Sequence, residues 1–378
     1  MKRWSKHSPS MSGKSIPIAD VSLGDAEIEA AVEVLRSGYL VQGEQVNAFE
    51  TEFADHVGAE HAIAVSSGTA ALHVAYLAAL EEGSDVLVPA LSHIATASMV
   101  EFAGCTPVFC DVDEYRYTLD VESARERMTP ETDAIAPVHL FGNVCDIEAI
   151  SALAADHGLT VIWDASQAHG STYEGADVGR FDDAVTYSFY PTKNMTTTEG
   201  GMITTDDDEF AERCRRLRSH WQTEKYYHPS VGLNYRMTDV AAAIGIEQLA
   251  QLDEFVASRR RNAAALTAGL EPLDEVTTPR VPGHRTHSYH QYTIQVDFDA
   301  LGCSREQFRE RLDDRGVGTA VHYPRPLHEQ PAFDTDVTLR VAERICRQVL
   351  SLPVYPALGA ADVEHVVEAV TATVGEYR

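Results

Sequence analysis

The sequence predicts an α/β protein, with a large domain built on a mostly parallel sheet and a smaller α+β domain after it. Between residues 61 and 207, short apolar runs of strand length mostly alternate with helix-like segments, which is typical of a parallel sheet covered on both faces. Near residue 240 this alternation gives way to one long helical pattern. With 378 residues, 44% of them hydrophobic, the chain is long enough for two domains.

The elements of the large domain follow from local signals. Asp25 can cap a helix that ends at Gly38, and a second helix over 47–58 ends at Gly58. Further helices are expected over 70–83, 95–104 and 146–158, and the first of these is apolar nearly all round, which predicts a buried helix. Strands are expected over 61–67, 85–90, 107–113, 134–141, 160–166, 184–191 and 201–207.

The smaller domain begins after a long or once-broken helix over 237–270. A strand over 289–298, a helix over 305–317, a proline-rich loop over 323–333 and two final helical segments follow it. We therefore predict a loose arm over 1–14, a large domain over 15–250 and a small domain over 251–378. The arm is basic but lacks the apolar stretch of a signal peptide.

The charge is strongly acidic, with 58 Asp and Glu against 30 Lys and Arg, a net charge of −28. This argues against a nucleic-acid or anionic-membrane surface, and no apolar run approaches the roughly 18 residues of a membrane span. Lysine occurs only at Lys2, Lys6, Lys14, Lys193 and Lys225. An acidic, lysine-poor chain favours a halophilic protein of a high-salt cytoplasm, the alternative being an ordinary acidic enzyme.

Several familiar signatures are absent. The six cysteines fit no zinc or disulfide framework, so we expect free thiols in a reducing cytoplasm and no metal site. No G-x-G-x-x-G follows a strand, and neither H-E-x-x-H nor G-x-S-x-G occurs. Gly13-Lys14-Ser15 resembles the end of a P-loop but has no strand before it.

Three segments carry possible chemistry. Gly68-Thr69 starts the predicted buried helix, where free N–H groups make either an anion site or an ordinary capped helix. Asp164 ends the strand over 160–166, where ligands gather in open sheets, although it could simply cap a turn. Lys193 lies in a loop of small and hydroxyl residues after the strand over 184–191.

A lone lysine is usually a solvated surface charge. Lys193, however, is one of only two lysines beyond residue 14, and a lysine can lose its proton and form a Schiff base where an arginine cannot. Together, a phosphate cup at the helix start, an acid at one strand end and a lysine after the next strand are the groups that pyridoxal phosphate (PLP) requires.

At these residues the chain resembles the DegT/DnrJ/EryC1/StrS sugar aminotransferases, a group with PLP-dependent transferase fold type I. The resemblance runs from about Ile16 to the C-terminus. Its motifs stand in the family's order and spacing: SSGTAALH, VPALSHIATA, DASQAHG, YSFYPTKN, GLNYRMTD, AAIGIEQL, VHYPRPLH and SLPVYP.

The resemblance implies a role for each matched position. Lys193 would bind PLP covalently and move the proton during catalysis, while Asp164 would pair with the ring nitrogen. Gln167 would bond the ring 3′-oxygen, and His93 stands where the family usually places an aromatic ring against the cofactor. The phosphate would be held by the helix start at Gly68, the N–H groups of Thr69 and Ala70, the Ser188 hydroxyl, and Asn234 of the partner subunit, in a homodimer with shared active sites.

The resemblance also implies the reaction. Lysine at position 193 separates the chain from a dehydratase branch that has histidine there. One motif resembles the branch of the family that aminates C4 of keto-deoxy nucleotide sugars, with C3 amination as the alternative. It consists of Asn234-Tyr235-Arg236-Met237-Thr238. The donor would be an amino acid, glutamate in the family, and the product would serve amino-sugar or glycan biosynthesis.

Local cations must hold the sugar's pyrophosphate despite the overall negative charge. The candidates are Lys225, Arg236, His322 and Arg325. Lys225 and Arg325 could equally be solvated loop charges. A non-catalytic regulatory protein that keeps PLP is a further alternative, although the intact set of Lys193, Asp164 and Gln167 favours an enzyme.

Overall fold

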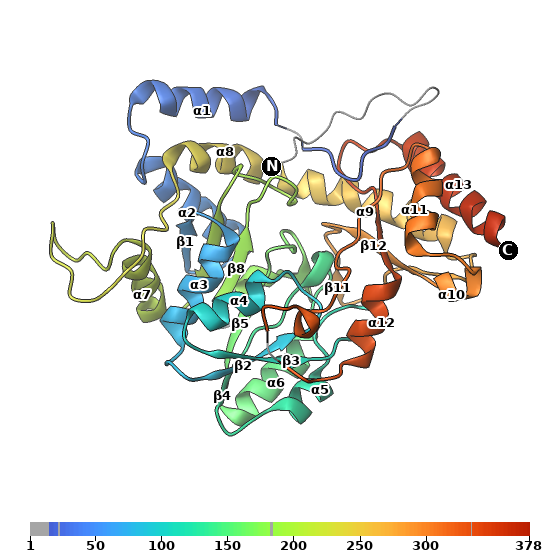
Figure 1. Cartoon of the computed structure of the whole chain (residues 1–378). Helices are drawn as coiled ribbons and strands as arrows, with labels where there is room; N and C mark the ends of the chain where they lie inside the picture. The colour runs from blue at the N-terminus through green and yellow to red at the C-terminus, as the bar shows by residue number, and fades with distance from the viewer. Residues whose placement is uncertain (1–14, 22, 182–183, 334) are drawn as a thin grey trace.

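The computed structural model describes residues 15–21, 23–181, 184–333 and 335–378. The arm expected over 1–14, which includes Gly13 and Lys14, lies outside the described residues. A seven-stranded sheet forms the centre, with helices on both faces (Figure 1). In sheet order, its strands are β1 (His61–Val65), β9 (Gly201–Thr205), β8 (Ala184–Ser188), β5 (Thr160–Asp164), β4 (Thr132–Ile135), β2 (Asp85–Pro89) and β3 (Thr106–Cys110).

The sheet is mostly parallel, as predicted, and β9 is the reversed strand. It pairs antiparallel with β1 on one side and with β8 on the other. The remaining pairs, from β8 through β5, β4 and β2 to β3, are parallel. β1 therefore lies at the edge of the sheet and has β9 as its partner there.

Helices cover both faces because successive strand residues point to opposite sides. On one face, Trp163 of β5 packs in a cluster with Phe53 and Leu249 of the helices. On the other, Ile162 packs with Tyr76 and Ile345. The helices of this part are α1 (Asp25–Ser37), α2 (Glu44–Val57), α3 (Gly68–Ala79), α4 (Ala95–Phe102), α5 (Val121–Arg127), α6 (Ile147–His157), α7 (Asp208–Arg218), α8 (Asp239–Leu249) and α9 (Leu252–Leu270).

The C-terminal part has a separate apolar cluster around a second, three-stranded sheet. Ile16 packs in this cluster, and its N–H donates to the Gly316 carbonyl. The domain boundary predicted at residue 250 stays a prediction. The elements are β10 (Val276–Thr277), β12 (Tyr292–Val296), α10 (Phe298–Leu301), α11 (Arg305–Asp314), α12 (Arg340–Gln348), β13 (Val349–Leu352) and α13 (Ala360–Tyr377), with a small third sheet of β6 (Thr172–Tyr173), β7 (Ala176–Asp177) and β11 (Arg285–Thr286).

Most expected elements are confirmed, and the differences have local causes. The long helix is broken between α8 and α9, and α3 is buried along most of its length. The strand expected over 134–141 is assigned only as far as Ile135, although the Ala136 N–H still donates to the Leu87 carbonyl and Val138 bridges to Asp164 in parallel. The chain leaves the sheet at Leu140–Gly142, where Phe141 has a φ of 62°. A strand pattern cannot place this end, because the turn residues Leu140 and Phe141 are buried and apolar like the strand before them.

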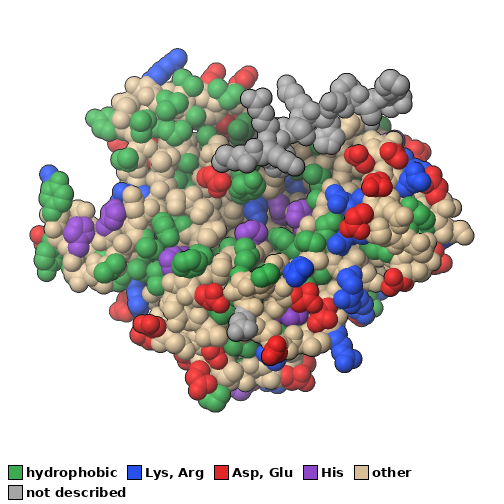
Figure 2. Space-filling view, in the orientation of Figure 1, with side chains coloured by type: hydrophobic (Ala, Val, Ile, Leu, Met, Phe, Trp, Pro, Cys, Tyr) green, Lys and Arg blue, Asp and Glu red, His purple; other side chains and the backbone are tan. Residues whose placement is uncertain are grey.

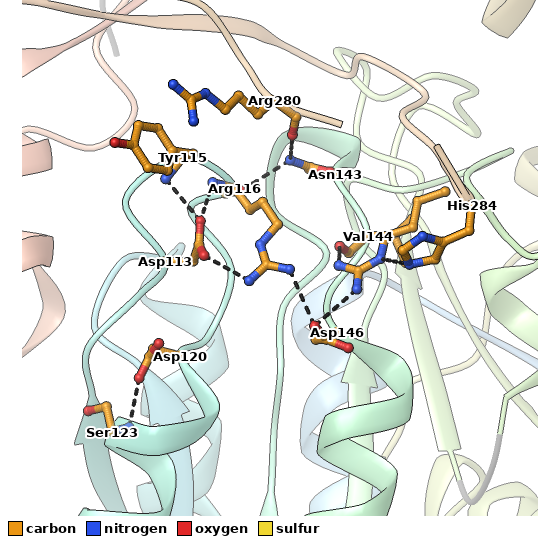
Figure 3. A network of polar contacts seen from close by, with 11 residues as sticks. Asp113, Tyr115, Arg116, Asp120, Ser123, Asn143, Val144, Asp146, Arg280 and His284 are labelled. Atoms are coloured by element: carbon orange, nitrogen blue, oxygen red, sulfur yellow. Dashed lines mark hydrogen bonds and ion pairs between the residues drawn. The ribbon is translucent and has the colours of Figure 1, made fainter. Parts of the chain in front are cut away.

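An arginine network joins three loops of the two parts (Figure 3). Arg116 donates to Asp113 at 2.7 Å and to Asp146 at 3.3 Å, and Arg285 pairs with the same Asp146 at 3.1 Å. Arg280 stacks over the Tyr115 ring, with its guanidinium carbon 3.8 Å from the centroid. The network fixes the segment that leads into β12 against the loops after β3 and before α6.

No helix among the described residues combines the length and the apolar character that crossing a bilayer requires.

Candidate active site

A cavity of about 490 Å³ lies where β5, β8 and the start of α3 meet. β5 and β8 run parallel, so their carboxyl ends lie at the same edge of the sheet. The cavity collects predicted site residues that are far apart in the sequence. They are Gly68, Thr69, His93, Asp164, Gln167, Ser188, Lys193 and His322.

The start of α3 is pressed against the end of β8. A Cβ on Gly68 would lie 2.5 Å from the Cβ of Ser188, and a Cβ on Gly201 would lie 2.4 Å from the Ser67 carbonyl oxygen. Both positions therefore require glycine. Ser67 caps the helix by accepting the Ala70 N–H at 3.1 Å. The helix start faces the cavity through Gly68 and Thr69, and the positive end of a helix dipole attracts an anion there.

Asp164 is buried and held in one orientation. Its Oδ2 accepts the Thr96 hydroxyl at 2.8 Å, and its Oδ1 accepts the Ser166 N–H at 3.0 Å. Thr96 is itself within 2.9 Å of the Ser92 hydroxyl. These contacts aim a carboxylate from the end of β5 into the cavity.

Lys193 lies in the loop between β8 and β9, where it is half-buried and lines the cavity. Burial lowers the pKa of Lys193 to about 8, and the Asp164 carboxylate partly opposes this shift. Burial also lowers the pKa of His93, with Lys193 contributing in the same direction and Asp164 against it. The amine is therefore available in its neutral, nucleophilic form at a pH where an exposed lysine stays charged.

Gln167 bridges two parts of the cavity wall. Its Oε1 accepts the Phe141 N–H at 2.8 Å, and its Nε2 donates to the Tyr323 hydroxyl at 3.2 Å. Tyr323 belongs to the C-terminal part, so this bond closes the cavity between the two parts of the chain.

Five predicted residues do not line this cavity. The Ala70 N–H is engaged by Ser67, and Asn234 is exposed on a segment that pairs with Ser219. Lys225 lies 5.5 Å from the ring of Tyr226 on an exposed loop. The other two are Arg236, which pairs with Val65 through its backbone, and Arg325, which is exposed and donates to the Glu329 carbonyl at 3.2 Å.

Sequence reasoning missed several cavity residues. Thr96 and Tyr323 stand inside motifs already singled out, VPALSHIATA and VHYPRPLH, so a signal for them existed. His290 and Gln291 also line the cavity. They lie just before β12, and no local sequence pattern marks them as cavity residues. Only the tertiary fold brings them to the cavity.

A buried amine that loses its proton near neutral pH is what a cofactor aldehyde requires, and the helix start across the cavity offers N–H groups to a phosphate. Fold and cavity together define a PLP-dependent transferase. The chain belongs to the DegT/DnrJ/EryC1/StrS aminotransferase family, whose model matches residues 21–371.

Three similar proteins are informative. A pleiotropic regulatory protein of Geobacillus stearothermophilus is 38% identical over 367 residues, covering 94% of this chain and 97% of that protein. The UDP-2-acetamido-2-deoxy-3-oxo-D-glucuronate aminotransferase of Pseudomonas aeruginosa is 36% identical over 349 residues, covering 91% and 95%. The crystal structure of S. venezuelae DesV with a ketimine intermediate has a TM-score of 0.91 and 34% identity, covering 96% and 99%.

These findings establish the class of enzyme. The chain has fold type I, its cofactor is pyridoxal phosphate, and it is a sugar aminotransferase. The non-catalytic alternative is thereby set aside, although one relative is named for regulation.

The lowered pKa of Lys193 predicts a pH dependence for cofactor loading. Only the neutral amine reacts with an aldehyde, so the rate at which PLP binds covalently to the apoenzyme should rise with pH and level off above about pH 8. Stopped-flow absorbance measures this rate, with N-acetyl-lysine amide as the exposed reference. A rate that keeps rising toward pH 10.5, as for the reference, would contradict the burial effect. A Lys193→Ala chain should give no signal.

Proposed function

We propose that the enzyme transfers an amino group from an amino acid, glutamate, to the C4 keto group of a nucleotide-linked deoxy sugar. The observation that carries this proposal is the cavity itself, where Lys193 and Asp164 lie with the start of α3. The activity would serve amino-sugar or glycan biosynthesis.

The cavity residues fit the cofactor. When bound, PLP supplies an aldehyde and an electron-accepting ring. Gly68 and Thr69 would bind its phosphate through the helix start, together with the Ser188 hydroxyl. Asp164, held by Thr96, would keep a proton on the ring nitrogen. Ala70 could join the phosphate contacts only by releasing its bond to Ser67.

Other side chains would orient the ring and move protons. Gln167 donates one amide hydrogen to Tyr323, which leaves the second for the ring 3′-oxygen. His93 would lie against the ring as a weaker stacking partner than Trp or Phe. Lys193 would hold the cofactor and then, as a neutral amine, accept the proton that leaves the donor's α-carbon at its Nζ.

The position of amination rests on similarity. Residues 234–238 resemble the C4 branch, whereas the Pseudomonas relative is named for a 3-oxo sugar. That relative keeps C3 amination as a second candidate. Both candidates require a nucleotide-linked keto sugar and an amino donor.

A direct assay tests the reaction. PLP-loaded enzyme with glutamate should aminate a 4-keto-6-deoxy sugar linked to GDP, UDP or dTDP, and NMR of the product should place nitrogen on C4. Lys193→Ala should give no product, because Lys193 is the amine proposed to hold the cofactor. Amination of 3-keto sugars alone would overturn the C4 assignment, and borohydride labelling at Lys225 instead of Lys193 would overturn the site.

We further propose a homodimer in which Asn234 contacts the partner's cofactor phosphate. Asn234 is exposed and outside its own chain's cavity. The preceding segment projects from the body beside α7, and its Tyr226 and Val231 are 84% and 88% exposed (Figure 1). Figure 2 shows further hydrophobic side chains over α1, where Leu35 is exposed. Apolar surfaces of this kind favour a partner.

Mixed dimers test the shared site. Lys193→Ala and Asn234→Ala chains, inactive or weak alone, should regain about a quarter of wild-type activity when unfolded, mixed and refolded, because half the dimers are mixed and each keeps one intact site. Mixing two separately tagged Lys193→Ala chains is the control. Verified mixed dimers without rescue would contradict the sharing of residues.

The sugar's pyrophosphate would be held by local cations. His322 lines the cavity, but burial lowers its pKa to about 4, so it would offer a neutral N–H and no charge. Lys225, Arg236 and Arg325 lie outside the cavity in the same chain. Lys225 is on the projecting segment, so in a dimer that shares its sites it would serve the partner's cavity along with Asn234.

The acidic composition supports a high-salt cytoplasm as the working environment. At about 0.01 M salt the Debye length is about 30 Å, so 58 acidic side chains repel one another across the surface. At about 1 M it falls to about 3 Å, and only near neighbours interact.

Melting temperature should therefore rise between 0.1 and 2 M KCl, because screening removes this repulsion from the folded state. The KM for the nucleotide sugar should rise as well, because salt weakens attraction to its phosphates. A family member with balanced charge is the control and should show little stabilisation. A flat or falling melting temperature for this protein would reject halophilic adaptation.

A further inference from the structure

A second cavity of about 180 Å³ opens beside the cofactor cavity. Its wall shares Thr192, His290, Gln291 and His322 with the first cavity, so the two are neighbours across these four side chains. The cofactor roles proposed above use none of these four. Pockets for drug-sized ligands are about 300–1,000 Å³, so this space suits one arm of a small molecule and excludes a nucleotide.

Arg259 of α9 brings a buried positive charge to this second cavity. Its Nη1 donates to the carbonyl oxygens of Val354 at 2.8 Å, Tyr289 at 3.2 Å and His290 at 3.4 Å. Its Nε is buried and has no acceptor among the described residues. A buried guanidinium held only by carbonyls still lacks a negative partner, which is costly unless a ligand supplies one.

Neutral donors extend this polar wall. His290 is buried, and its Nδ1 has no partner among the described residues. The Ser351 hydroxyl, which also lines the cavity, lies 3.1 Å from His322 Nδ1. Burial lowers the pKa of His290 well below its usual value, with Lys193 and Arg259 contributing, so the imidazole is neutral and can offer one N–H.

An amino-acid donor needs such a cation. Lys193 is the only lysine or arginine among the described residues that line the cofactor cavity. Its amine would be bound to the cofactor and so could not hold the donor's carboxylate. The charged acids there, Asp164 and Glu199, repel a carboxylate. Among the described residues that line the two cavities, Arg259 is the remaining fixed cation.

We infer that the second cavity is the subsite for a carboxylate of the amino-acid donor, bound by Arg259 with His290 beside it. This inference rests on the proposed function and assigns the donor's recognition to residues outside the cofactor contacts. Asp20 also lines the cavity and is exposed. The negative charge of Asp20 repels a bound carboxylate. The donor's carboxylate therefore lies at the buried end of the cavity, at Arg259.

Arg259 itself is a poor test position, because its loss would also break three backbone contacts. Ala320 lines the second cavity but not the first, and Ala320→Leu fills the space while leaving Arg259 in place. Ala265→Leu, on an exposed part of α9 outside both cavities, is the matched control. Asp20→Asn removes the opposing charge and should bind an anion more tightly.

Calorimetry with glutarate, an unreactive dicarboxylate, measures binding to borohydride-treated holoenzyme without turnover. Ala320→Leu should lower the affinity for glutarate at least tenfold, and Asp20→Asn should raise it about twofold. The affinity of the Ala265→Leu enzyme should match that of wild type. In single turnovers followed by absorbance, Ala320→Leu should lower the affinity for glutamate to the same extent. Its affinity for the nucleotide sugar should change less than twofold.

The outcomes separate the two ideas. Wild-type glutarate binding in Ala320→Leu, or equal losses for glutamate and sugar, overturns the subsite while the transaminase proposal stands. A wild-type enzyme that accepts no amino acid in the single turnover overturns both, since the subsite would then have no donor to recognise.

Discussion

Removing the Lys193 amine from water is the constraint around which the site is arranged. Burial lowers its pKa to about 8, and the same burial, with Lys193 contributing, lowers the pKa of His169 to about 3 and of His322 to about 4. These imidazoles are therefore neutral at physiological pH, and the amine is surrounded by uncharged rings. Among the described residues, Asp164 is the one whose charge favours the protonated amine. A cavity kept free of competing cations leaves the amine reactive and leaves the helix start as the attraction for a phosphate.

Close backbone packing and side-chain bonds made away from the reacting groups together hold this arrangement in place. Glycine at positions 68 and 201 lets α3 approach the β8–β9 pair so closely that any Cβ would meet Ser188 or the Ser67 carbonyl. The cavity is then closed from the other part of the chain by the bond from Gln167 to Tyr323. The arginine network about Asp146 secures the segment that leads into β12, the strand before which His290 and Gln291 lie (Figure 3). Positions of catalytic groups therefore depend on contacts made at a distance from them.

Much of this could be predicted from the sequence, because strand and helix patterns and turn residues are local. The α/β alternation, the buried α3 and the helical region over 237–270 all follow from such patterns. The turn at Leu140–Gly142 could not be predicted, since Leu140 and Phe141 are as apolar and buried as the strand before them. Lys193, Asp164 and Gly68 stood out by residue type and position after strands. The burial of Lys193 and the approach of His290 are products of the tertiary fold, and no local signal encodes them. Thr96 lies in a motif that the sequence offered, but its bond to Asp164 depends on the fold.

The reversed strand β9 has a consequence for synthesis on the ribosome. β1 is complete at Val65, yet its sheet partner ends at Thr205, about 140 residues later. At about 5–20 residues per second, this gap lasts about 7–28 s. Throughout that interval a buried apolar strand has an unpaired edge, which is a template for wrong pairing with other nascent chains. α2 is already synthesised, and its Phe49 and Phe53 pack with Ala62 and Ala64 on a face of β1. The order of emergence thus covers a face of β1 early and leaves its pairing edge open until β9 follows.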